Sequence, residues 1–181
     1  MQPYPAKLTH PQDKSAERPG VGRQIVALVA LLAASFLVAG LGALATTSNV
    51  EGWYATADKA PWSPPNGVFG PVWTVLYTAM AVAAWLVWRK RAPGTKRALT
   101  AYGIQLALNL AWTPVFFALY PAIGTPALWL ALDIILARIA AVSVTVLYFG
   151  PISRAAGLLL LPYISWLVFA ATLNWWAAVH N

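Results

Sequence analysis

Aromatic side chains recur at helical spacing in three separate apolar segments, and each run includes a polar or small residue. Because residues three or four positions apart share one face of a helix, each segment carries a stripe of broad rings. Such stripes suit a flat, mostly apolar ligand with a few polar edges. The alternative is ordinary interhelical core, in which amide side chains hydrogen-bond across helices. The first stripe holds Phe69, Trp73, Tyr77 and Met80, the second Gln105, Asn109, Trp112 and Phe116, and the third Trp166, Ala170, Leu173 and Asn174.

The residue types that usually perform catalysis or bind metals are scarce. The chain has no cysteine, and its two histidines, His10 and His180, stand near opposite ends. We therefore expect no metal site and no required cofactor. Asp133 and Arg138 stand in one apolar segment, about 140° apart around a helix, so they do not pair directly. Charges at membrane depth are candidates for function; the alternative is that each faces the bundle or a dimer seam and pairs with a polar neighbour.

The composition identifies the elements that must position these residues. Of 181 residues, 60% are hydrophobic and 9% are charged, whereas a soluble domain is roughly a quarter charged. The apolar residues form blocks of about 20 or more, the length that a helix needs to cross a bilayer. The alternation typical of membrane strands is absent. We predict an all-α membrane protein with five transmembrane helices, at about 25–45, 68–88, 99–120, 125–149 and 155–179.

The net charge of +7 is distributed in a way that indicates membrane topology rather than nucleic-acid binding. Basic residues lie in a polar tail, residues 1–22, which we predict to be disordered, in the link 89–97 and at Arg154. The intervening connectors hold Glu51, Asp58 and Lys59. The positive-inside rule then predicts a cytoplasmic N-terminus and an extracytoplasmic C-terminus. The first apolar block also resembles a signal peptide, but at about 21 residues it exceeds the usual 7–15.

The connector from Thr46 to Gly67 is the only long loop on the side opposite the basic links. It holds Trp53, Tyr54 and Trp62, and a helical turn is expected near its start. One interpretation is an aromatic belt at the lipid headgroups. Its prolines favour a shaped lid instead, because proline fixes φ and lowers the entropy lost when a loop closes. They are Pro61, Pro64 and Pro65.

Three strings in this order resemble the TspO/MBR family of tryptophan-rich sensory and translocator proteins. The first is APWSPP at 60–65 with GPVW at 70–73. The second is QLALNLAWTPVFF at 105–117. The third is LPY at 161–163 with Trp166, Phe169-Ala170 and Leu173-Asn174. The similarity runs from about Ile25 to the end of the chain.

The resemblance implies a five-helix bundle, commonly a homodimer, whose first loop caps an internal pocket. It also implies a membrane receptor or carrier for porphyrins, with a role in tetrapyrrole regulation, transport or stress sensing. Mitochondrial members also bind cholesterol. The positions that match the family's ligand site are Trp53, Tyr54, Trp62, Pro64 and Pro65 in the lid, and Trp73, Tyr77, Asn109, Trp112, Phe116, Trp166 and Ala170 in the helices.

The same resemblance leaves other functions open. Trp53 and Trp166 match tryptophans implicated in light-dependent porphyrin degradation, so an enzyme is the main alternative. A secondary transporter is disfavoured because the chain shows no internal repeat. Metal-free porphyrin is expected over haem, since no histidine lies at membrane depth to ligate iron. Lys59 is the only basic residue near the mouth that could meet a propionate. Cholesterol binding is doubtful, because Trp175 replaces the tyrosine of the sterol pattern and no basic residue follows.

Overall fold

The computed structural model describes residues 19–181, apart from the side chain of Ser48, and within this range every regular element is a helix. Predicted tail residues 1–18 lie outside the described part. The all-α prediction is confirmed for residues 19–181. The elements are α1 (Val21–Val50), α2 (Trp53–Thr56), α3 (Asn66–Trp88), α4 (Thr95–Thr113), the π-helical turn η1 (Pro114–Ala118), α5 (Tyr120–Ile123), α6 (Thr125–Ile152), α7 (Arg154–Leu159) and α8 (Leu161–His180).

Four segments of the described chain are long and apolar enough to cross a membrane. They are Val21–Thr47, Asn66–Trp88, Thr125–Ile152 and Arg154–His180. The predicted span at 99–120 is not among them. Its α-helical geometry begins at Thr95 and ends after 19 residues at Thr113, and α4 carries Lys96 and Arg97 at its start.

The first helix is longer than its apolar block at both ends. Val21 and Gly22, the end of the predicted tail, are already helical. The Gln24 side chain donates to the carbonyl of Pro19 at 2.7 Å, and the Trp85 indole donates to the carbonyl of Gln24 at 3.0 Å. Trp85 on α3 therefore anchors the start of α1. At the other end α1 runs to Val50, and the expected helical turn in the loop is α2.

Proline explains why the middle helix changes geometry. Pro114 has no amide proton to complete the α-helical ladder, and the amide of Leu119 bonds to the carbonyl of Pro114, five residues back, at 2.9 Å. The chain widens into the π-helical turn η1, a feature that often marks functional sites. It then closes with α5 and turns at Gly124, where φ is +70°, a conformation suited to glycine.

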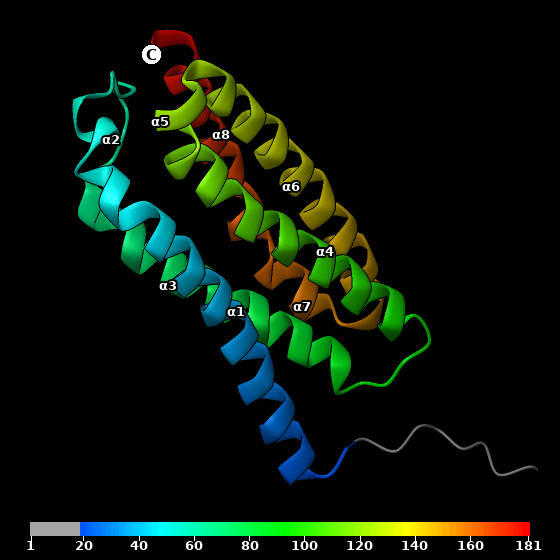
Figure 1. The fold of residues 1–181 in the computed structure, drawn as a ribbon. Coiled ribbons are helices and arrows are strands. Elements are labelled where there is room, and N and C mark those ends of the chain that lie inside the picture. The colour runs from blue at the N-terminus through cyan, green and yellow to red at the C-terminus, as the bar shows by residue number, and fades with distance from the viewer. Residues whose placement is uncertain (1–18) are drawn as a thin grey trace, which may run out of the picture.

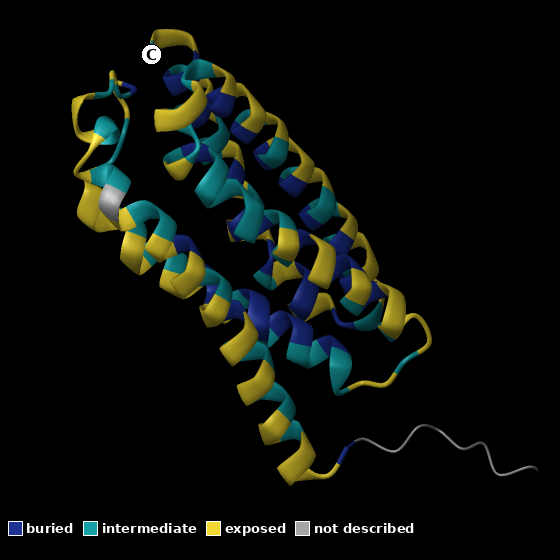
Figure 2. Cartoon of the chain, in the orientation of Figure 1, coloured by how far each residue is buried: buried dark blue, intermediate teal, exposed yellow. Residues whose placement is uncertain are grey.

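The elements gather into a bundle with two distinct ends. Figure 1 shows α2, α5 and the C-terminus at one end, and the start of α1 and the α3–α4 connector at the other. In Figure 2 buried positions follow the inward faces of the helices, whereas exposed positions follow the outward faces. Many outward side chains are apolar: Leu44, Val75 and Leu147 expose 75%, 66% and 72% of their surface. An apolar exterior suits a lipid environment.

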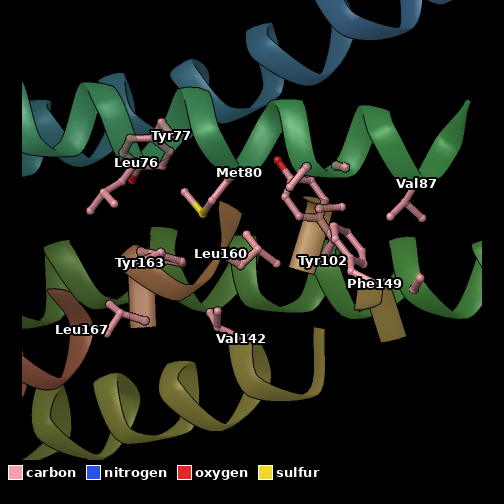
Figure 3. Packing of buried hydrophobic residues seen from close by; sticks show 14 of the residues in the cluster. Leu76, Tyr77, Met80, Val87, Tyr102, Val142, Phe149, Leu160, Tyr163 and Leu167 are labelled. Atoms are coloured by element: carbon pink, nitrogen blue, oxygen red, sulfur yellow. The ribbon is translucent and has the colours of Figure 1, made fainter. Parts of the chain in front are cut away.

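The main hydrophobic core lies where α3 meets α4, α6, α7 and α8. Tyr77 and Met80 of α3 face Leu160, which lies between α7 and α8, and Tyr163 of α8, as Figure 3 shows. Met80 and Tyr163 are fully buried. At the other end of the same core the Tyr102 ring packs against Phe149 at an interplanar angle of 28°, and its hydroxyl bonds to Ser35 of α1 at 2.8 Å. The candidate site adjoins this core, because Tyr77 belongs to both.

Candidate functional site

A cavity of about 440 Å³ lies between α1, α3, the α4–η1 segment and α8. Its volume falls within the roughly 300–1,000 Å³ usual for small-molecule sites. A more open hollow at the α3–α4 connector is bordered by Trp88, Arg91 and Lys96, and it lacks converging rings. The candidate site is therefore the cavity between α1, α3, the α4–η1 segment and α8, which is the less open of the two.

Broad aromatic rings form much of the cavity wall. Trp112 and Phe116 lie nearly parallel, with ring centroids 5.1 Å apart. Trp73 contacts Tyr77 at 5.6 Å and meets Trp166 at 6.4 Å with an interplanar angle of 88°. All five residues line the cavity. A planar ligand would find both faces and edges of rings there, the two geometries in which aromatic groups attract one another.

Asn109 is the polar centre of this wall and is almost fully buried. Its Oδ1 accepts a hydrogen bond from the Tyr77 hydroxyl at 3.0 Å, and its Nδ2 donates to the Tyr163 hydroxyl at 2.8 Å. The amide thus joins α4 to α3 and α8. Asn109 ties the helices together and also lines the cavity. Gln105, by contrast, bonds to the Met80 sulfur at 3.7 Å and does not line the cavity.

A second polar link holds the Trp112 ring in place. The indole N–H of Trp112 donates to Oδ1 of Asn174 at 3.0 Å. The Asn174 amide in turn donates to the carbonyl of Leu128 at 2.9 Å. Since Asn174 is on α8 and Leu128 on α6, these two bonds link the Trp112 ring of α4 to both helices.

The two charges of the fourth predicted span have opposite surroundings. Arg138 is 1% exposed, and its Nη2 donates to the Tyr163 hydroxyl at 3.0 Å. Its guanidinium also lies 5.6 Å from the Trp73 ring centroid and 5.8 Å from that of Trp112. Asp133 is exposed on the outer face of α6. Arg138 therefore faces the bundle with a polar neighbour, whereas Asp133 faces away from it.

The loop that carries α2 packs against η1. The Trp53 indole donates to the carbonyl of Phe117 at 2.9 Å, and its ring stacks on Tyr120 at 3.9 Å. Tyr54 makes edge contacts with Phe116 and Phe117 and lines the cavity. Burial raises the pKa of the Tyr54 phenol.

The far part of the loop is tied to α8. The Trp62 indole donates to the Thr172 hydroxyl at 3.2 Å, although the ring remains 46% exposed. The side chain of the last residue, Asn181, binds the backbone of the loop at Asp58. The Asp58 amide donates to Oδ1 of Asn181 at 2.8 Å, and Nδ2 of Asn181 donates to the Asp58 carbonyl at 3.2 Å. Both ends of the loop are thus attached to other elements.

The structure divides the predicted ligand residues into two groups. Those lining the cavity are Tyr54, Trp73, Tyr77, Asn109, Trp112, Phe116, Trp166 and Ala170. Those outside its lining are Trp53, Trp62, Pro64 and Pro65. Trp53 lies behind Phe116, and Trp62 packs on the outer end of α8 against Trp176. Pro65 precedes the first residue of α3, so it sets where that helix begins.

Sequence reasoning missed the wall contributed by α1. Ala39, Gly42, Ala43 and Thr46 line the cavity. Here α1 lies close to the end of α4, because a Cβ added at Gly42 would approach Oγ1 of Thr113 to 3.2 Å. Small residues carry no chemical signal of their own. The remaining lining residues are Phe36, Thr47, Val50, Asn66, Phe69, Gly70, Thr74, Thr113, Phe117, Leu173 and Asn174.

No cluster of three or more potential metal ligands occurs within residues 19–181. The described histidine, His180, stacks on Trp176 at 3.7 Å at the end of α8. It does not line the cavity. The lining offers aromatic faces and edges to a flat apolar molecule.

Comparison with known proteins identifies the family. The TspO/MBR family model matches residues 27–179. The translocator protein of Homo sapiens is 38% identical over 154 residues, which cover 80% of this chain and 88% of the human protein. The tryptophan-rich protein TspO of Archaeoglobus fulgidus is 35% identical over 150 residues, 83% of this chain and 94% of that protein. The tryptophan-rich sensory protein of Cereibacter sphaeroides is 36% identical over 147 residues, 80% and 88% of the two chains. With its apolar helices and this match, the chain belongs to the TspO/MBR family of integral membrane proteins.

Proposed function

We propose that the protein is a membrane receptor or carrier that binds a metal-free porphyrin in the cavity, beneath the loop that carries α2. The observation that carries this proposal is the convergence of Trp73, Tyr77, Trp112, Phe116 and Trp166 on one cavity of about 440 Å³. Each ring that stacks on a porphyrin adds about 0.5–1.5 kcal/mol beyond its burial. The role in tetrapyrrole regulation, transport or stress sensing follows from the ligand and is part of the proposal.

The test is a titration of the purified protein in nanodiscs with protoporphyrin, followed by tryptophan quenching and the Soret band. Trp112→Ala should weaken binding by about tenfold or more, since it removes a stacking face and its burial. Trp129→Ala is the matched control, because Trp129 is on α6 and 45% exposed on the outer surface. Equal affinities for the two variants would contradict the proposed site.

The same titration with haem and with cholesterol tests ligand class. We expect haem to bind without the spectrum of bis-imidazole ligation, since the cavity lining contains no histidine. A six-coordinate imidazole spectrum would contradict this expectation. We expect cholesterol to bind only weakly.

Light-driven porphyrin degradation at Trp53 and Trp166 is the alternative. Trp166 lines the cavity, which favours it as a partner of an excited pigment. Trp53 is held by the Phe117 carbonyl and Tyr120, behind the wall. Illumination with protoporphyrin should separate the two functions, using Trp53→Phe and Trp166→Phe with protein-free controls. Pigment loss that is equal in all samples leaves binding alone.

We further propose that α4, η1 and α5 together form a fifth membrane crossing, with the N-terminus cytoplasmic. The basic residues Arg89, Lys90 and Arg91 directly follow α3, at the end of the bundle opposite α2 and the C-terminus (Figure 1). Because the chain has no cysteine, single cysteines report topology cleanly. Arg91→Cys should react with a membrane-impermeant maleimide only from the cytoplasmic side, and Asp58→Cys only from the other.

A homodimer is the assembly we propose. Gly103 and Ala107 are exposed on the outer face of α4, with Ala111 one turn further along and half-buried. Small residues at this spacing allow close helix contact in lipid. Ala107→Cys should form a disulfide-linked dimer under mild oxidation, whereas Ala140→Cys on the exposed face of α6 should not.

A further inference from the structure

Arg138 is a buried cation whose countercharge is missing from the described chain. It is 1% exposed, and it is in the middle part of α6, one of the membrane-spanning segments. No ion pair to Arg138 occurs within residues 19–181, and its Nε has no hydrogen-bond partner there. Asp133, five positions away on the same helix, is exposed on the outer face. A charge in this position is costly unless something of opposite charge comes near.

The contacts that Arg138 does make compensate its charge only partly. One hydrogen bond reaches the neutral Tyr163 hydroxyl at 3.0 Å. The rings of Trp73 and Trp112 lie 5.6 Å and 5.8 Å from the guanidinium, a distance at which cation–π attraction is real but weaker than an ion pair. These contacts orient the guanidinium without neutralising it.

The same contacts place the cation directly behind the cavity wall. Trp73 and Trp112 both line the cavity. Tyr163, which accepts from Arg138, also accepts from the cavity residue Asn109. One layer of side chains therefore separates the positive charge from the space that a ligand would occupy. In an apolar surrounding, a charge acts across such a layer far more strongly than it would in water.

Two polar side chains of the wall are already hydrogen-bonded within the protein. The amide oxygen and nitrogen of Asn109 bond to Tyr77 and Tyr163, and the Trp112 indole donates to Asn174. The buried indole N–H of Trp166, by contrast, has no partner within the described residues. A cavity with a cation behind its wall favours a ligand that brings an acceptor with negative charge.

We propose that the cavity selects ligands bearing an ionised carboxylate, and that Arg138 is the residue that determines this selectivity. The inference rests on the proposed function and refines it. For a porphyrin, it means that a propionate turns inward toward α6. Lys59 at the loop then need not supply the countercharge, and its ammonium already lies over the Tyr54 ring at 4.8 Å.

The test compares each carboxylic acid with its neutral ester in nanodiscs of zwitterionic lipid. Two ligand pairs are used: protoporphyrin with its dimethyl ester, and pyrenebutyric acid with its methyl ester. The wild-type protein should bind each acid about tenfold more tightly than its ester, which corresponds to about 1.4 kcal/mol. Arg138→Met should abolish the preference with little change in ester affinity, and Arg138→Lys should retain most of it. Arg154→Met, at an exposed arginine of α7, should leave it unchanged.

The outcomes separate the two proposals. If acid and ester bind the wild type equally, the selectivity proposal is wrong, although porphyrin binding stands. If pyrenebutyrate is preferred over its ester but neither porphyrin binds, the porphyrin function is wrong and the carboxylate selectivity stands. If neither pair binds, both are wrong. Should Arg138→Met fail to fold, Arg138→Gln replaces it, because it keeps a polar side chain without the charge and should likewise lose the preference.

Discussion

The hydrogen-bonded junction at Asn109 allows a quantitative test of how the cavity wall is held. Asn109→Leu removes two buried interhelical bonds, one from Tyr77 at 3.0 Å and one to Tyr163 at 2.8 Å. Such bonds average about 0.6 kcal/mol in membrane helices, with a maximum near 1.7. The Tyr163 hydroxyl keeps its bond from Arg138, whereas the Tyr77 hydroxyl loses the partner seen in the structure. We therefore expect Asn109→Leu to lower the free energy of unfolding by about 1–3 kcal/mol.

The sharper measurement is a double-mutant cycle with Tyr77→Phe. Alone, this change leaves Oδ1 of Asn109 buried without its donor and should cost about 1 kcal/mol. In the Asn109→Leu background it should cost nothing, because its partner is already absent. The two effects should thus fall short of additivity by about 1 kcal/mol, well above the roughly 0.3–0.5 kcal/mol scatter of independent sites. Reversible unfolding in mixed micelles measures each free energy.

The Tyr102 hydroxyl provides a matched control. It is buried like that of Tyr77, but it bonds to Ser35 at 2.8 Å and not to Asn109. Tyr102→Phe should therefore cost the same in the wild type and in Asn109→Leu. If Tyr77→Phe and Asn109→Leu were additive within about 0.3 kcal/mol, the junction would contribute nothing as a unit, and our account of the wall would be refuted.

Three further predictions address the cavity and the loop above it. Ala170→Phe should fill space in the cavity and weaken protoporphyrin binding by about tenfold or more, whereas Ala140→Phe on the outer face of α6 should not; a titration measures both. Asn181→Ala removes the side chain that holds both backbone groups of Asp58, so the Asp58 amide should exchange hydrogen about fivefold faster in native-state exchange, for a loss of about 1 kcal/mol. Burial raises the pKa of the Tyr54 phenol, so the unfolded chain loses this proton before the folded chain as pH rises above about 10. The free energy of unfolding should therefore fall above that pH, and it should fall less in Tyr54→Phe. Absorbance titration and unfolding at alkaline pH measure the two effects.

Helices were the most predictable feature of the fold, because each apolar block is long enough to reveal its class. Their ends were less predictable. α1 starts at Val21 rather than Ile25 because its first turn is anchored by Trp85 on another helix. The predicted span at 99–120 ends its α-helical geometry at Thr113, where Pro114 imposes a π-helical turn. A hydropathy pattern reports which residues avoid water and is silent on such local backbone geometry.

The helical residues of the candidate site were easier to predict than those of the loop. Spacing places Asn109, Trp112 and Phe116 on one face, and that face does line the cavity. The loop tryptophans Trp53 and Trp62 lie outside the lining, because each indole N–H is used to attach the loop to η1 or α8. Helical periodicity constrains where a side chain points, whereas an irregular loop has no such rule.

The sequence by itself determined that the chain is helical, apolar enough for a membrane, and a member of the TspO/MBR family. These properties follow from the order of residues along the polypeptide chain. Only the tertiary structure decided which rings share a cavity, that small residues of α1 complete its wall, and that Arg138 lies behind it without an acidic partner in the described residues. The physical reason is that closure and charge compensation depend on distances between helices that are remote in sequence. Arg138 and Tyr163 are joined across 25 positions and Asn109 and Tyr163 across 54, separations that no local pattern encodes.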